Sequence, residues 1–114
     1  MSELLKIVVK ELDERLASNI EVIDLRGISP FTDYFVIAGA NNQRLANAMI
    51  NGVIEKATKN NHDYRAIEGK GDSDWILLDL YELVVHVFSE EAREIYQLEK
   101  LWGDLPRVNI DDLL

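Results

Sequence analysis

The sequence predicts a single α+β domain, with a mixed five-stranded sheet and three helices. The chain has 114 residues, which suits one domain with a real core. Its hydrophobic content of 47% indicates a globular fold. The predicted elements follow the order α-β-β-α-β-β-β-α, and the last three strands are too closely spaced for helical crossovers. The sheet is therefore expected to be mixed rather than doubly wound.

The chain begins with a predicted helix and strand. Over residues 3–17, apolar residues recur at the three- and four-residue spacing of an amphipathic helix. Residues 20–25 alternate enough to predict a strand. Gly27 and Pro30 then mark a loop.

The middle of the chain predicts a strand, a helix and a further strand. Residues 33–40 are rich in β-branched and aromatic residues and predict a near-continuous apolar strand in the centre of the sheet. Asn41 or Asn42 can cap the helix that follows, which ends near Lys59. Residues 62–68 predict a third strand.

Residues 68–88 are the stretch around which the other elements are expected to be arranged. Residues 74–80 and 83–88 predict a β-hairpin with a two-residue turn. Directly opposed residues share a face, so one face is wholly aliphatic and the other is mixed. The aliphatic face carries Ile76, Leu78, Leu80, Leu83, Val85 and Val87. The mixed face carries Trp75, Leu77, Asp79, Val84, His86 and Phe88.

Two interpretations of the mixed face follow from the pattern. Helices of the same chain could cover it, with Trp75 in the core and with His86 and Asp79 satisfied locally. Alternatively, it is a partner surface centred on Trp75 and Leu77, because large apolar groups beside a carboxylate suit a binding hot spot with a polar rim.

The last part of the chain predicts a helix and a tail. Ser89 can cap the helix, Trp102 lies on its apolar side, and Gly103 fits a left-handed C-terminal position. We expect the domain to span residues 1–104. Residues 105–114 are expected to form an acidic tail that is loosely docked or binds a neighbour.

Composition restricts the partners and the compartment. The absence of cysteine excludes disulfides and thiolate zinc sites. With 21 acidic and 12 basic residues, the net charge of −9 predicts little direct binding of nucleic acid and favours a basic protein as the partner. No stretch is long enough to span a membrane, and the N-terminus lacks a signal or transit pattern, so we expect a cytoplasmic protein.

Candidate catalytic residues are few. Asp72 and Asp74 could hold magnesium, but Gly69–Gly71 leads into a strand rather than a helix N-terminus, so a phosphate cradle is missing. His86 could be a general base oriented by Asp79, yet no serine or threonine shares the predicted face. We therefore predict a binding module without a metal or cofactor, and not an enzyme.

The chain resembles the ribosomal silencing factor family, also called the RsfS or Iojap family, in two runs: DYFVIAGANNQR and EGKGDSDWILLDLYELVVHVFSEEAREIYQLEKLWGD. The resemblance extends from the first helix to Trp102. It implies a fold similar to nucleotidyltransferases without their catalytic signature. It also implies a translational repressor that binds the large ribosomal subunit through ribosomal protein fourteen and sterically blocks joining of the small subunit.

The resemblance also points to site residues, through the family's D-W-x-x-x-D segment. Trp75 and Leu77 would be apolar anchors, and Asp79 would pair with a basic residue of the partner. Lys70 and Tyr81 would lie at the margins of this strip. Two alternatives stay open: a nucleotidyltransferase-like, nucleotide-binding enzyme and a homodimeric adaptor module that uses the same surface.

Overall fold

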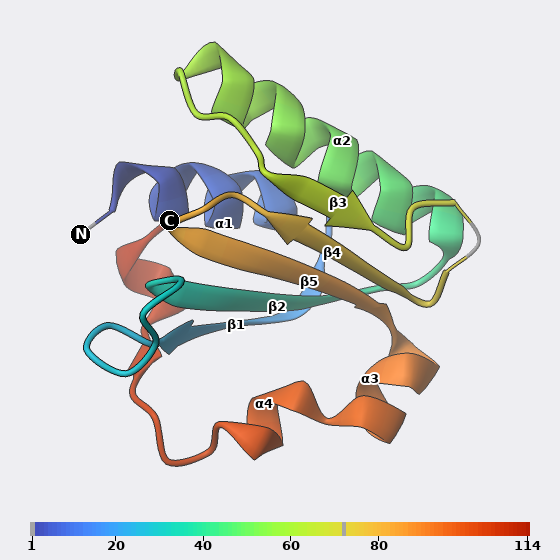
Figure 1. Cartoon of the computed structure of the whole chain (residues 1–114). Coiled ribbons are helices and arrows are strands. Elements are labelled where there is room, and N and C mark those ends of the chain that lie inside the picture. Colours follow the sequence, from blue (N-terminus) through green and yellow to red (C-terminus); the bar gives the residue numbers. More distant parts are fainter. Residues whose placement is uncertain (1, 72) are drawn as a thin grey trace.

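A six-stranded sheet forms the centre of the protein, in a computed structural model that describes residues 2–71 and 73–114. Helices α1 and α2 cover one face, and the α3–α4 segment lies on the other (Figure 1). The elements are α1 (Glu3–Glu14), β1 (Ser18–Asp24), β2 (Tyr34–Ala40), α2 (Gln43–Lys59), β3 (Ala66–Glu68), β4 (Trp75–Asp79), β5 (Leu83–Ser89), α3 (Glu90–Tyr96), α4 (Leu98–Leu101), β6 (Arg107–Val108) and a 3₁₀ turn (Ile110–Asp112). Among the described residues, no helix combines the length and the apolar character needed to cross a bilayer.

The sheet is mixed, as the sequence predicts, but it has six strands rather than five. The strand order is β3-β4-β5-β2-β1-β6. Strands β2 and β5 run parallel, and the other neighbouring pairs are antiparallel. The sixth strand, β6, escaped prediction because two residues are too few to show a strand's alternating pattern.

The predicted hairpin register is confirmed. Ile76 lies opposite Val87, and the Leu80 N–H donates to the Leu83 carbonyl at 2.9 Å, which closes a two-residue turn. Tyr81 occupies the first turn position with φ of 70°. A positive φ at that position is what a tight hairpin turn requires, although glycine usually supplies it.

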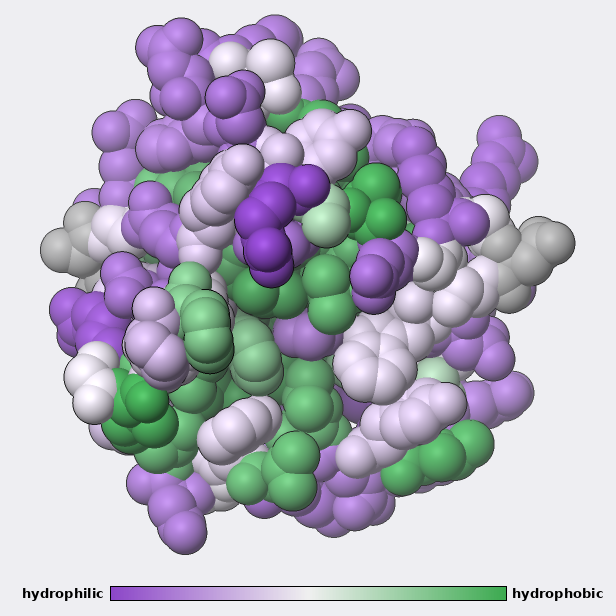
Figure 2. Space-filling view, viewed as in Figure 1, coloured by the Kyte–Doolittle hydropathy of each residue, from purple (hydrophilic) through white to green (hydrophobic). Residues whose placement is uncertain are grey.

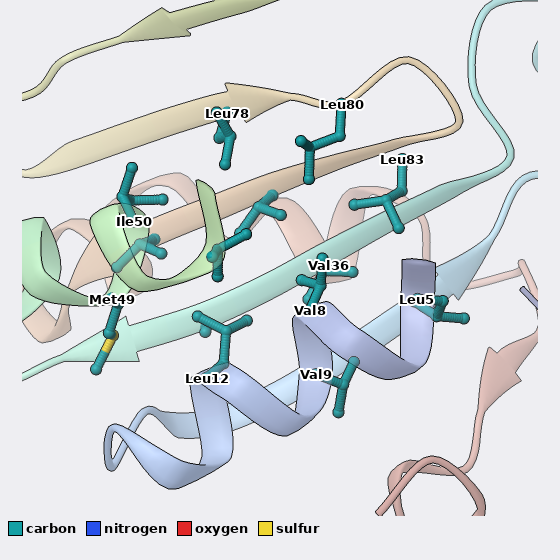
Figure 3. Close-up of a cluster of buried hydrophobic side chains, with 14 of the residues drawn as sticks. Leu5, Val8, Val9, Leu12, Val36, Met49, Ile50, Leu78, Leu80 and Leu83 are labelled. Carbon is teal, nitrogen blue, oxygen red and sulfur yellow. The ribbon is translucent and has the colours of Figure 1, made fainter. Parts of the chain in front are cut away.

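The main core lies between the sheet and helices α1 and α2. Ser2 caps α1 by accepting a hydrogen bond from the Leu5 N–H, and Asn42 caps α2 in the same way through the Leu45 N–H. The aliphatic face of the hairpin is buried in this core. Figure 3 shows side chains of α1, α2 and the strands meeting in this layer.

The C-terminal helix differs from the prediction. Ser89 caps α3 as expected, but the helix ends at Tyr96, where Gln97 takes the left-handed conformation with φ of 47°. Gly103, which was predicted to hold that conformation, is not among the residues with positive φ. The break lets the short helix α4 turn so that Leu98 and Trp102 pack against the second cluster of buried residues.

The tail is built into the fold rather than loosely docked. Val108 of β6 pairs with Val22 of β1. Leu113 is 4% exposed and belongs to the main core, whereas the neighbouring Leu114 is 54% exposed. Residues 105–114 therefore complete both the sheet and the core.

We predict that Leu113→Ala lowers the free energy of unfolding by about 2 kcal/mol, because it removes a buried side chain from the main core. The matched change Leu114→Ala should alter it by less than about 0.5 kcal/mol. Urea denaturation followed by circular dichroism measures both. Equal, small effects would show that the tail does not stabilise the fold.

Candidate functional site

The second face of the sheet is only partly covered by the protein's own helices. The α3–α4 segment buries a cluster over β1, β2 and β5 whose members are Ile23, Leu25, Ile37, Phe88 and Ala92. The cover ends before β4, where Trp75 and Leu77 remain half-buried. Figure 2 shows this face, with an apolar area near its middle and hydrophilic residues around it. The first interpretation, cover by helices of the same chain, is thus confirmed for part of the face. The second, a partner surface, stays a prediction for the part around Trp75 and Leu77.

Trp75 is held in a fixed orientation. Its ring centroid lies 4.8 Å from that of Phe88 and 5.0 Å from that of Tyr96. Its indole N–H donates to Nδ1 of His86 at 3.1 Å, and its backbone N–H donates to Oγ of Ser73 at 3.1 Å. A large side chain held in place by its neighbours loses little conformational freedom when a partner covers it. Trp75 is therefore suited to be an anchor.

His86 lies beneath the strip and is 3% exposed. Burial lowers its pKa to about 4, so the imidazole is neutral at physiological pH. Because Nδ1 accepts the Trp75 N–H, the ring proton is on Nε2. Asp79 does not orient this ring, contrary to the general-base hypothesis. His86 instead positions Trp75.

Asp79 already has partners within the chain. Its Oδ2 accepts hydrogen bonds from Nε and Nη2 of Arg65 at 2.9 and 2.5 Å, and its Oδ1 accepts one from the Tyr81 N–H at 2.9 Å. Asp79 was expected to pair with a basic residue of a partner. In the structure, Arg65 of the same chain already makes such an ion pair with it. The sequence analysis missed Arg65, although the pairing of Ala66 with Asp79 brings it close.

Lys70 and Tyr81 lie at opposite ends of β4, and both are exposed. Lys70 sits in the turn before β4, where the side chain of Asn47 bonds both the N–H and the carbonyl of Gly71 at 3.1 Å. Gly69 has φ of 82°, and a Cβ there would lie 2.1 Å from the Trp75 carbonyl oxygen, so this turn requires glycine. The structure thus places Lys70 and Tyr81 at the two margins of the strip.

The loop between β1 and β2 adds candidate residues that the sequence analysis did not single out. Phe31 is 89% exposed, and Ile28 is also exposed. The loop is tied to the hairpin turn, because the Asp33 N–H donates to the Glu82 carbonyl at 2.7 Å. A phenylalanine inside a loop marked by Pro30 was the available signal.

The acidic pair considered for magnesium, and set aside for want of a phosphate cradle, falls partly outside the described residues. Asp72 lies outside the described residues, and Asp74 is exposed. Across residues 2–71 and 73–114, no group of three or more His, Cys, Asp or Glu side chains could hold a metal ion.

The fold and this surface define a small α+β binding module whose candidate contact strip is Trp75, Leu77 and Asp79 on β4. Trp75 and Leu77 are half-buried, and Asp79 is buried. Comparison with known proteins is consistent with this class. The family model described as "Ribosomal silencing factor during starvation" matches residues 1–114. The chain belongs to this family of ribosomal silencing factors, which is a regulatory family rather than an enzyme family.

Individual relatives support the same family assignment. The ribosomal silencing factor RsfS of Bacillus subtilis is 37% identical over 108 residues, which cover 95% of this chain and 92% of that protein. A mouse protein named mitochondrial assembly of ribosomal large subunit protein 1 is 37% identical, over 84% of this chain and 43% of that protein. A crystal structure of a protein from Bacillus halodurans is 33% identical with a TM-score of 0.83, and the match covers 94% of this chain and 97% of that one.

We predict that the stability of the protein falls as the pH drops from 6.5 to 4. In this window the unfolded chain protonates His86, whose ordinary pKa is 6.5, while the folded protein keeps the ring neutral. The expected contribution is roughly 3 kcal/mol. Urea denaturation of the wild type and of His86→Gln across this range measures it. If both proteins lose the same stability, His86 is not buried in its neutral form.

Proposed function

We propose that this protein silences translation by binding the large ribosomal subunit through ribosomal protein fourteen and thereby blocking joining of the small subunit. The observation that carries the proposal is the half-buried strip of Trp75 and Leu77 on a sheet face that the α3–α4 segment covers only in part. Family membership supports the ribosome as the target, and the mouse relative is named for assembly of the large subunit.

The strip has the features of a binding hot spot. Trp75 is rigidly packed, and Leu77 lies next to it on the same face of β4. Polar groups border both residues, with Lys70 at one end and the Arg65–Asp79 ion pair at the other. An apolar centre inside a polar rim is the usual arrangement at protein interfaces.

Net charge favours a protein rather than RNA as the direct contact. A chain with a formal charge of −9 is repelled by the phosphate backbone of ribosomal RNA and attracted to a basic ribosomal protein. Charges set the rate and orientation of the approach, and the apolar strip supplies most of the affinity.

The mechanism requires no chemistry at the site. A bound protein of this size, with a Cα radius of gyration of 12.8 Å, is bulky enough to obstruct the joining face of the large subunit. Silencing then depends only on whether the binding site on the subunit is occupied.

The same strip would be buried in a homodimer, so self-association through it would compete with binding to the subunit.

We predict that Leu77→Ala and Trp75→Ala each weaken binding to isolated large subunits by about thirtyfold or more, as expected for removal of a hot-spot side chain. Co-sedimentation with large subunits measures the affinity. Leu16→Ala is the matched control, because Leu16 is 77% exposed at the end of α1, on the opposite side of the sheet. It should bind like the wild type.

Leu77→Ala is the more informative variant, because Trp75 also packs on Phe88 and Tyr96 and its loss affects the fold. Circular dichroism and urea denaturation of each variant separate loss of binding from loss of structure. A folded Leu77→Ala protein that binds with wild-type affinity would rule out the strip as the contact.

A further inference from the structure

The apolar surface continues past the strip into a cavity of about 580 Å³ between the β1–β2 loop and the hairpin turn. Its lining combines aromatic and apolar side chains with the Arg65–Asp79 ion pair, and it includes Phe31, Phe35, Arg65, Asp79, Tyr81 and Val84, together with Thr32 of the loop. We propose that this cavity receives an arginine side chain of the partner protein. The choice of a basic protein as partner rests on the proposed function.

The walls of the cavity suit a guanidinium group. Phe31 and Tyr81 both line it, and both rings are exposed. A planar guanidinium stacks favourably on the faces of aromatic rings. Phe35 and Val84 add apolar surface that can cover the aliphatic stem of a long basic side chain.

The cavity also holds a buried carboxylate with unused acceptor capacity. Both nitrogens of Arg65 bond the same oxygen of Asp79, Oδ2. Among the described residues, Oδ1 accepts only the N–H of Tyr81. A carboxylate has about four acceptor positions, so Oδ1 can accept a further N–H donor. Arg65 lines the same cavity, so the incoming guanidinium would share the carboxylate with it, Arg65 on Oδ2 and the partner's group on Oδ1.

A second polar atom of the lining lacks a partner. The hydroxyl oxygen of Thr32 is buried and makes no hydrogen bond within the part of the chain that the structure describes. Ser29 accepts hydrogen bonds from the backbone N–H groups of Phe31 and Thr32 at 3.1 and 3.3 Å, which fixes the loop around this hydroxyl. A hydroxyl can accept from a donor-only group such as guanidinium.

These features favour arginine over lysine. An ammonium group is a compact, strongly hydrated charge, whereas guanidinium is planar, weakly hydrated and able to stack on a ring while donating to a carboxylate. The cavity offers both kinds of contact side by side. The net charge of −9 further favours a cationic occupant.

The test is a nitrogen-15 NMR titration of the full chain with the blocked tripeptide Gly-Arg-Gly. The matched probes are the same peptide with lysine and with the neutral arginine analogue citrulline. We expect saturable shifts of the Thr32 and Tyr81 amide signals with the arginine peptide only. Phe31→Ala should weaken this binding by about fivefold or more, because one stacking ring is lost. Ile28→Ala, an exposed apolar change in the same loop but outside the cavity lining, should leave it unchanged.

The outcomes separate this inference from the proposed function. Equal or absent shifts with the three peptides overturn the arginine assignment, as does an unchanged affinity in Phe31→Ala. If Phe31→Ala co-sediments with large subunits as well as the wild type does while Leu77→Ala fails, the function stands and the cavity is not used. If Phe31→Ala instead turns a dimer of the free protein into a monomer, a second copy is the occupant and the proposal is wrong.

Discussion

The register of the β4–β5 hairpin is the constraint on which the rest of the structure depends. Side chains alternate along a strand, so placing six aliphatic residues in the core forces Trp75, Leu77 and Asp79 onto the opposite face. A slip of one residue would expose those six residues at a cost on the order of 10 kcal/mol, comparable to the whole stability of a small domain. The position of the candidate surface is therefore a consequence of core packing.

The C-terminal segment determines how much of that second face is left for a partner. Arg93 anchors α3 by donating to the Ser18 carbonyl at 3.1 Å and to Glu21 at 3.1 Å. The break at Gln97 then directs α4 over β1 and β2, away from β4. Tyr96, the last residue of α3, packs against Trp75 with the ring centroids 5.0 Å apart. One half of the face is thus internal core, while the other half remains a surface with firmly held side chains.

Much of the fold could be predicted, because helices and strands leave a periodic apolar pattern in the sequence. The caps Asn42 and Ser89 and the two-residue hairpin turn could also be predicted, because each depends on residues that are neighbours in the sequence. The sixth strand and the helix break could not be predicted, since both depend on tertiary contacts. The same holds for Asp79, whose partner Arg65 belongs to a neighbouring segment, and for the exposed ring of Phe31.

The most direct measurement of the central claim is hydroxyl-radical footprinting of the protein, free and bound to large ribosomal subunits. Side chains on the half-covered face, above all Trp75 and Leu77, should lose reactivity in the complex, while Leu16 on the opposite side keeps it. Protection centred on α1 and α2, with Trp75 as reactive as in the free protein, would contradict the account.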